Sequence, residues 1–283
     1  MSSQSAVLSS PIPVGHFLEV QDAYRLHYHE IGQPNADRPT LLFLHGSGPG
    51  ASGYSNFHLN FPYFAEQGYH VLVPDYLGYG LSDKPDDIGY TSTLHVEVLR
   101  EFLLKKNVTR VVLVGNSLGG AIAFQYGLTY PEQVAKLVVM GPGGVEAPEL
   151  WAGQMSGLRC MGAFIQGRKT DKASFRELLH HIVASPEMIT DELIDTRLSV
   201  WLEQPMAVFS TMKVEVFAER LAELKMPVLC LWGQKDNFLP VRHALIVAGL
   251  VSNARVIIST GSGHWFMLEE PDYFNREVLS FLG

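Results

Sequence analysis

Cysteine is almost absent from this chain of 283 residues, since Cys160 and Cys230 are its only two. Two thiols make no disulfide framework, which fits the reducing cytoplasm. No run of five basic residues occurs, and 29 acidic residues outnumber 21 basic ones, for a formal net charge of −8. We therefore expect neither nucleic acid nor an anionic membrane as a partner.

Long apolar stretches are also missing. No window of 18 uncharged apolar residues occurs, so we expect no transmembrane helix. The segment 1–13 is rich in serine and has no basic start, which favours a short disordered lead-in over a signal peptide.

Metal-ligand patterns are absent too. The pairs His27/His29 and His180/His181 have no third ligand nearby, so we expect no metal and no other cofactor.

What the chain does have is a series of short, continuously apolar runs separated by helical segments. These runs are at 40–44, 71–73, 111–114, 137–140 and 228–232, and a last strand is predicted at 254–259. Such runs are typical of parallel strands that are covered on both faces, so the sequence predicts an α/β fold with a mostly parallel central sheet. Residues 16–31 instead alternate apolar and polar, which predicts two antiparallel strands with one solvated face.

The α/β alternation stops between about Val145 and Met212. That stretch holds no strand-like run and is rich in Trp, Met, Phe and Leu. We interpret it as a helical cap over a pocket, inserted into one core. The core then comprises 1–144 and 213–283, and the cap comprises 145–212. The alternative is an ordinary run of surface helices.

The strongest local signal is the stretch Gly115-Asn116-Ser117-Leu118-Gly119, which directly follows a predicted strand and precedes a predicted helix. A G-x-S-x-G motif in this setting is the nucleophile elbow of a serine hydrolase. The sharp turn exposes the hydroxyl of Ser117 above the sheet, and the glycines let the strand and the helix pass closely. A glycine-rich packing turn with an incidental serine is the alternative.

A nucleophilic serine needs a base, and the base needs an acid that orients it. In this fold the chain order is serine, acid, histidine. Asp236 is the only acid in the loop after the strand 228–232, and His264 is the only histidine in the loop after the strand 254–259. All three groups thus follow C-terminal strand ends, where ligands bind in open α/β sheets.

The loop His45-Gly46-Ser47-Gly48-Pro49-Gly50 follows another buried strand. In a serine hydrolase this loop gives one oxyanion N–H, here that of Ser47, and the residue after the nucleophile, Leu118, gives the other. Gly46, Gly48 and Ala51 also satisfy the dinucleotide pattern G-x-G-x-x-A, and Asp75 ends the next strand. An NAD-dependent oxidoreductase is therefore the rival hypothesis. Pro49, which lacks an amide for pyrophosphate, and the complete triad count against it.

Taken together, these motifs resemble the α/β-hydrolase superfamily over nearly the whole chain. Within it the sequence is most similar to the meta-cleavage product hydrolases, which cleave carbon–carbon bonds in ring-fission products of aromatic compounds. The matching stretches are 44–51, 55–57, 115–120, 139–144 and 263–265.

The resemblance implies roles for residues at matching positions. Ser117, Asp236 and His264 match the triad, and Ser47 and Leu118 match the oxyanion amides. Substrate contacts are implied for Gly48, Asn56, Asn116 and Trp265, and Arg197 aligns with a cap arginine that holds the substrate carboxylate.

The implied substrate is an anionic 2-hydroxy-6-oxo-dienoate. Because the chain is net acidic, long-range attraction cannot bring this anion in, whereas a local guanidinium with two parallel N–H groups can hold it.

We further expect a cytoplasmic enzyme that needs no cofactor and that forms a homodimer or a higher homo-oligomer. The chain departs from many members at Phe266-Met267 and in 151–172, so the distal substituent, alkyl or aryl, stays open. The choice between an acyl-enzyme and a gem-diol route for the hydrolysis also stays open. A serine carboxylesterase is the alternative function.

Overall fold

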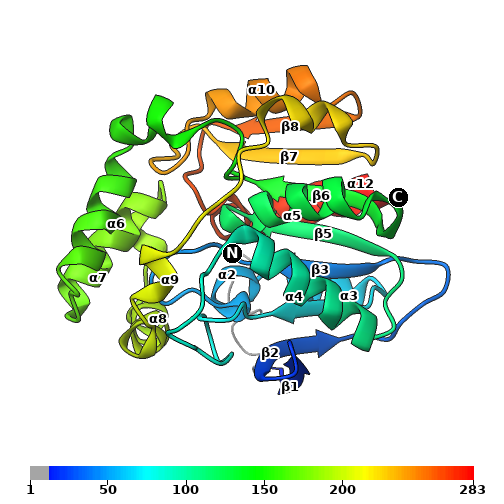
Figure 1. Ribbon diagram of the computed structural model, residues 1–283. Helices are drawn as coiled ribbons and strands as arrows, with labels where there is room; N and C mark the ends of the chain where they lie inside the picture. The colour runs from blue at the N-terminus through cyan, green and yellow to red at the C-terminus, as the bar shows by residue number, and fades with distance from the viewer. Residues whose placement is uncertain (1–12) are drawn as a thin grey trace, which may run out of the picture.

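The computed structural model describes residues 13–283, so the lead-in predicted for 1–13 lies outside the described residues except for Pro13. One eight-stranded sheet runs through the molecule in the order β1-β2-β4-β3-β5-β6-β7-β8 (Figure 1). β1 pairs antiparallel with β2, and β2 with β4, while all other neighbours are parallel. The strands are β1 (Gly15–Val20), β2 (Tyr24–Ile31), β3 (Thr40–Leu44), β4 (Val71–Pro74), β5 (Val111–Asn116), β6 (Val134–Met140), β7 (Val228–Gly233) and β8 (Ala254–Ser259).

Helices cover both faces of this sheet, which explains the continuously apolar strands. Along β3, Leu42 and Leu44 belong to one apolar core, whereas Leu41 and Phe43 belong to the other. Because successive strand residues point to opposite faces, both sets are buried. The first core is closed by α4 (Ser92–Lys105), α5 (Leu118–Thr129) and α10 (Arg242–Leu250). The second is closed by α2 (Gly53–Phe57), α3 (Phe61–Glu66), α11 (Phe266–Glu269) and α12 (Pro271–Leu282).

The antiparallel pair β1–β2 is confirmed, but its predicted solvated face is wrong for β2. His27 and His29 are both buried, although they stand in the polar positions of the alternating pattern. The Nδ1 atom of His27 lies 2.8 Å from the carboxylate of Asp75, and Nδ1 of His29 lies 3.0 Å from the carbonyl oxygen of Pro13. These partners satisfy imidazoles that the pattern alone assigned to solvent.

Within 145–212 the described chain is helical and contains no strand. Its helices lie beyond the C-terminal ends of the parallel strands, at the left of Figure 1. Apolar side chains of this segment, among them Phe164, Phe175 and Trp201, join the second core. The α-helices are α6 (Ser156–Gln166), α7 (Lys172–Ile182), α8 (Asp191–Glu203) and α9 (Ala207–Ser210).

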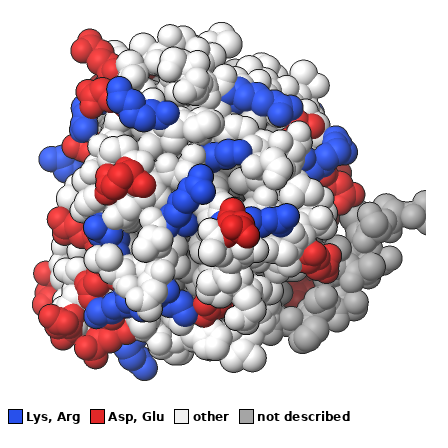
Figure 2. All heavy atoms as spheres, turned by 90° about the vertical axis from the view of Figure 1, so that its right-hand side faces the viewer, with Lys and Arg blue, Asp and Glu red and all other residues white. Residues whose placement is uncertain are grey.

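The opposite end of the molecule, where the parallel strands begin, shows acidic and basic side chains interspersed (Figure 2). Neither sign forms a continuous patch on this face. None of the helices in the described residues has the length and apolar character needed to cross a membrane.

Candidate active site

Ser117 occupies the turn between β5 and α5 with strained backbone angles of φ 57° and ψ −114°. A non-glycine residue with positive φ is uncommon, and such strain is typical of functional turns. A Cβ atom at Gly119 would collide with the carbonyl of Leu44, and one at Gly115 would collide with the carbonyl of Gly119. The two glycines thus permit the close strand–helix passage that the sequence predicts. Within the described chain the hydroxyl of Ser117 has no hydrogen-bond partner.

The loops after β7 and β8 bring Asp236 and His264 together. The Oδ2 atom of Asp236 lies 2.7 Å from Nδ1 of His264, and both residues are buried. The other oxygen, Oδ1, accepts the backbone N–H groups of Phe238 at 2.7 Å and Leu239 at 2.9 Å. These bonds fix the carboxylate as an acceptor, so Nδ1 of His264 is the donor and Nε2 is left to take a proton.

Two contacts to the His264 loop were not evident from sequence. The ring of Phe238 stacks on His264 with 5.3 Å between the ring centroids. The carboxylate of Glu269 accepts the N–H of Gly263 at 2.8 Å and that of Ala184 at 2.7 Å. Glu269 thereby ties the histidine loop to the end of α7. Neither role has a local motif, because each depends on residues that meet only in the fold.

Ser47 and Leu118, the residues of the two predicted oxyanion amides, both line the cavity that Ser117 lines. Leu118 is the first residue of α5, so its N–H has no partner within the helix. Ser47 lies in the loop after β3, which His45 holds in place. Nδ1 of His45 donates to the carbonyl of Gly46 at 2.7 Å, and Nε2 accepts the N–H of Tyr76 at 3.1 Å. Burial lowers the pKa of His45 to about 4, so this imidazole stays neutral.

Arg197 of α8 is only 1 % exposed, although it is a cation. Its Nη1 atom donates to the Ser55 hydroxyl at 3.2 Å and to Oδ1 of Asn56 at 3.5 Å, and Nη2 donates to the carbonyl of Pro49 at 3.1 Å. The guanidinium lies over the ring of Trp265, 4.9 Å from the centroid. Every one of these partners is neutral.

No carboxylate of residues 13–283 forms an ion pair with Arg197, and its Nε atom is buried without a hydrogen bond. Burial lowers the pKa of Arg197 to about 9. An unpaired buried charge is costly, and it is usually neutralised by a counter-ion. The structure therefore contains a cationic site that an anion would complete.

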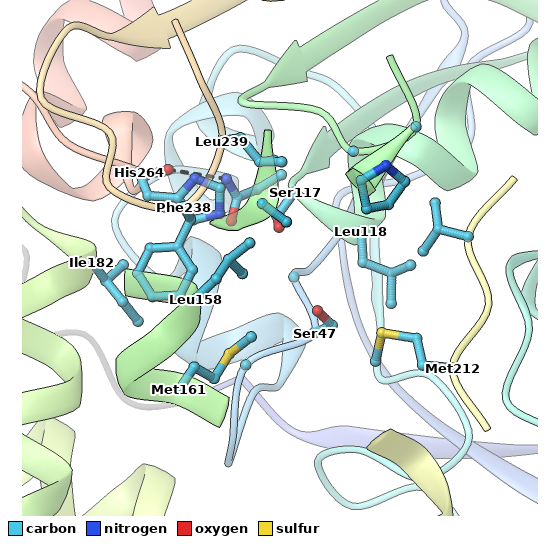
Figure 3. A pocket seen from close by; sticks show the side chains of 18 of the residues that line it. Ser47, Ser117, Leu118, Leu158, Met161, Ile182, Met212, Phe238, Leu239 and His264 are labelled. Carbon is cyan, nitrogen blue, oxygen red and sulfur yellow. Dashed lines mark hydrogen bonds between the residues drawn. The ribbon is translucent and has the colours of Figure 1, made fainter. Parts of the chain in front are cut away.

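Arg197, Ser117 and His264 line one cavity of about 280 Å³ between the sheet and the helices of 145–212. Figure 3 shows Ser117 and Ser47 near the middle of the view, with His264, Phe238, Leu158, Met161 and Ile182 to their left. The predicted contact residues also line it, namely Gly48, Asn56, Asn116, Leu118 and Trp265. Among the predicted site residues, only Asp236 lies behind the cavity wall, where it holds His264.

Comparisons with known proteins agree with this geometry. Residues 39–161 match the family model of the alpha/beta hydrolase fold. The chain is 35% identical over 277 residues to a 2-hydroxy-6-oxononadienedioate/2-hydroxy-6-oxononatrienedioate hydrolase of Paraburkholderia phymatum, covering 94% of this chain and 93% of the relative. It is 32% identical over 267 residues to a 2-hydroxy-6-oxo-6-phenylhexa-2,4-dienoate hydrolase of Burkholderia cepacia, covering 92% and 91%. The chain belongs to the meta-cleavage product hydrolases.

Among solved structures, a meta-cleavage product hydrolase from Pseudomonas fluorescens IP01 has the same fold, with a TM-score of 0.83 and 26% sequence identity. The alignment covers 95% of this hydrolase and 97% of that chain. The predicted α/β-hydrolase fold and the predicted family are therefore both confirmed.

The rival dinucleotide hypothesis fails on the surroundings of Asp75. In this hydrolase the Asp75 carboxylate accepts the N–H of Gly53 at 2.7 Å and that of Leu81 at 2.9 Å, besides its contact with His27. It is buried, so no ribose hydroxyl can reach it. The helix after the glycine-rich loop, α2, has only five residues and offers no phosphate site of the dinucleotide kind.

Asn116 is more constrained than a simple substrate contact. Its Nδ2 atom donates to the carbonyls of Met140 and His264, both at 3.2 Å, and its Oδ1 atom accepts Nδ2 of Asn56 at 3.2 Å. The amide thus links the nucleophile strand to the histidine loop. Asn56 continues the link toward Arg197.

Proposed function

We propose that this hydrolase cleaves the carbon–carbon bond of a 2-hydroxy-6-oxo-dienoate, with Arg197 holding the C1 carboxylate. The observation that carries the proposal is a fully buried guanidinium whose partners are all neutral. A carboxylate ligand would supply the missing counter-charge and the missing acceptor at once. A simple ester has no group for this site.

The strand order supports an elongated substrate. Arg197 contacts the loop after β3 and helix α2, whereas Ser117 follows β5, the next strand of the sheet. A dienoate held by its carboxylate at Arg197 therefore extends its 6-oxo group toward Ser117. There the N–H groups of Ser47 and Leu118 are suited to hold the oxyanion that forms on attack.

The proposed reaction has two stages. The dienol first takes up a proton on C5 and becomes a ketone, with His264 assisting the transfer. Ser117, or a water that it activates, then attacks C6, and the C5–C6 bond breaks as the electron pair leaves on the stabilised C5 carbanion. Water supplies a hydroxyl to C6 and a proton to the C2 oxygen, because the electron pair from the C5–C6 bond is delocalised onto that oxygen and restores the dienol. The products are 2-hydroxypentadienoate and a carboxylic acid.

We also propose that 145–212 acts as the cap, with 1–144 and 213–283 as the two parts of the core. The support is that this segment carries Arg197 and much of the apolar wall of the cavity. The reducing cytoplasm is the proposed location, because Cys160 and Cys230 are both free thiols.

The test compares coloured dienoates with simple neutral esters on purified protein. We expect bleaching of at least one dienoate with kcat/KM of about 10⁴ M⁻¹s⁻¹ or more, without any added cofactor and in the presence of a chelator. If a panel from small alkyl to aryl substituents is not bleached while simple esters are cleaved efficiently, the carboxylesterase alternative is correct instead.

A further inference from the structure

Much of the lining of the cavity is apolar. Eight of its side chains make up the surface that we call the distal wall: Trp151, Leu158, Met161, Ile182, Met212, Val214, Val216 and Phe238. Figure 3 shows Leu158, Met161, Ile182 and Phe238 grouped on one side of the open space and Met212 on the other. Of the lining residues of the whole cavity, Arg197 is the only lysine or arginine.

The one carboxylate that lines the cavity is that of Glu146. Its Oε2 atom lies 2.8 Å from Nη2 of Arg242 and 2.8 Å from Nε2 of His243. Burial alone would raise the pKa of Glu146, but these hydrogen bonds lower it, so the carboxylate stays ionised near neutral pH. Arg242 is turned to Glu146 and is not among the lining residues.

Glu146 and Arg197 lie at opposite ends of the site. Arg242 and His243 are in α10, which lies beside β7 and β8 at the top of Figure 1, whereas α8 with Arg197 lies at the lower left and contacts α2. Ser117, after β5, is between them in the sheet order. A substrate anchored by its C1 carboxylate at Arg197 thus places its C6 substituent against the distal wall and toward Glu146.

We infer that this enzyme is selective for dienoates whose C6 substituent is uncharged and apolar, and that it discriminates against those with a second carboxylate there. The inference rests on the proposed function and adds the substrate class. A terminal carboxylate would lose its hydration against the distal wall, find no cation, and meet Glu146. An alkyl or phenyl group would instead be removed from water by the same wall.

This selectivity differs from what the names of several relatives suggest. The relative from Paraburkholderia phymatum at 35% identity is named for a dioate, and that from Burkholderia cepacia at 32% identity for a phenyl substrate. Overall identity does not choose between the two. The charges that line the cavity favour the second kind of substrate.

The experiment measures kcat/KM of the wild-type enzyme for 2-hydroxy-6-oxo-6-phenylhexa-2,4-dienoate, for its 6-methyl analogue and for 2-hydroxy-6-oxononadienedioate. We expect the better of the two apolar substrates to exceed the dioate at least tenfold. Equal or higher kcat/KM for the dioate would overturn the inference and leave the proposed function intact. Failure of all three substrates alongside efficient ester cleavage would contradict the proposed function itself.

A variant that removes the charge of Glu146 tests whether this residue causes the discrimination against the dioate. Glu146→Gln keeps an acceptor for Arg242 and His243 and removes the negative charge, so kcat/KM for the dioate should rise roughly tenfold while the apolar substrates change less than about twofold. Glu149→Gln is the matched control, because Glu149 is exposed and does not line the cavity. If Glu146→Gln and Glu149→Gln have the same effect on the dioate, Glu146 does not discriminate.

Discussion

Replacement of Arg197 by methionine should separate substrate recognition from stability. Methionine retains an unbranched apolar side chain over Trp265 but lacks the charge and all donors. A charge-assisted hydrogen bond contributes about 1.5–3 kcal/mol, so loss of the contact to the C1 carboxylate corresponds to a roughly 10- to 150-fold decrease in kcat/KM. Because the carboxylate is bound before and during the reaction, most of this change should appear in KM.

The same substitution should cost little stability in the free enzyme. The guanidinium of Arg197 is buried without a counter-ion and with Nε unpartnered, so its removal relieves the desolvation cost of a charge. Against this, the carbonyl of Pro49 loses a donor at 3.1 Å, which costs about 1–3 kcal/mol if no water replaces it. The two effects oppose each other, and we expect a change in the free energy of unfolding of at most about 1 kcal/mol.

The assay uses a matched pair of substrates, the dienoate and its C1 methyl ester, with urea unfolding measured on the same preparations. Wild-type enzyme should prefer the acid by roughly 10- to 150-fold, and Arg197→Met should abolish that preference. Equal losses on both substrates, or a variant that no longer folds, would show that Arg197 has a structural role and would refute the reasoning.

Three further predictions concern the triad and one buried histidine. Ser117→Ala should fold normally, as judged by circular dichroism, and lose about 10⁴–10⁶ in kcat; turnover near wild type would exclude Ser117 as nucleophile. Asp236→Asn should lower kcat by about 10⁴, because the amide favours the wrong tautomer of His264; full activity would mean that another carboxylate orients it. Burial lowers the pKa of His95 to about 3, so the unfolded chain takes up one more proton below pH 6.5. The free energy of unfolding should therefore fall by up to about 1.4 kcal/mol per pH unit between 6 and 4, and His95→Gln, followed by urea titration at each pH, should remove this contribution; parallel pH profiles of variant and wild type would exclude it.

The features with a local signature were predictable from the sequence. Apolar runs bounded by turn residues located the parallel strands, and the glycines around Ser117 located the elbow because close backbone passage leaves no alternative residue. Asp236 and His264 followed from chain order, since each is the only residue of its type in its loop. Their hydrogen bond at 2.7 Å agrees with that assignment.

What the sequence did not reveal depends on contacts between distant segments. His27 and His29 occupy the polar positions of an alternating strand, yet they are buried by partners such as Asp75, 48 residues away from His27. Glu146 has no motif, and its position at the distal end of the cavity arises only when α10 packs beside it. Charge and exposure at such positions are properties of the fold and not of the local pattern.

The identity of the products tests the central claim most directly. A coloured 2-hydroxy-6-oxo-dienoate is hydrolysed to completion in ¹⁸O-labelled water, and the products are identified by mass spectrometry. We predict one 2-hydroxypentadienoate and one carboxylic acid per dienoate consumed, with the label in the carboxylic acid that derives from C6. Recovery of the intact carbon skeleton after prolonged incubation, with Ser117-dependent cleavage of esters alone, would contradict the account.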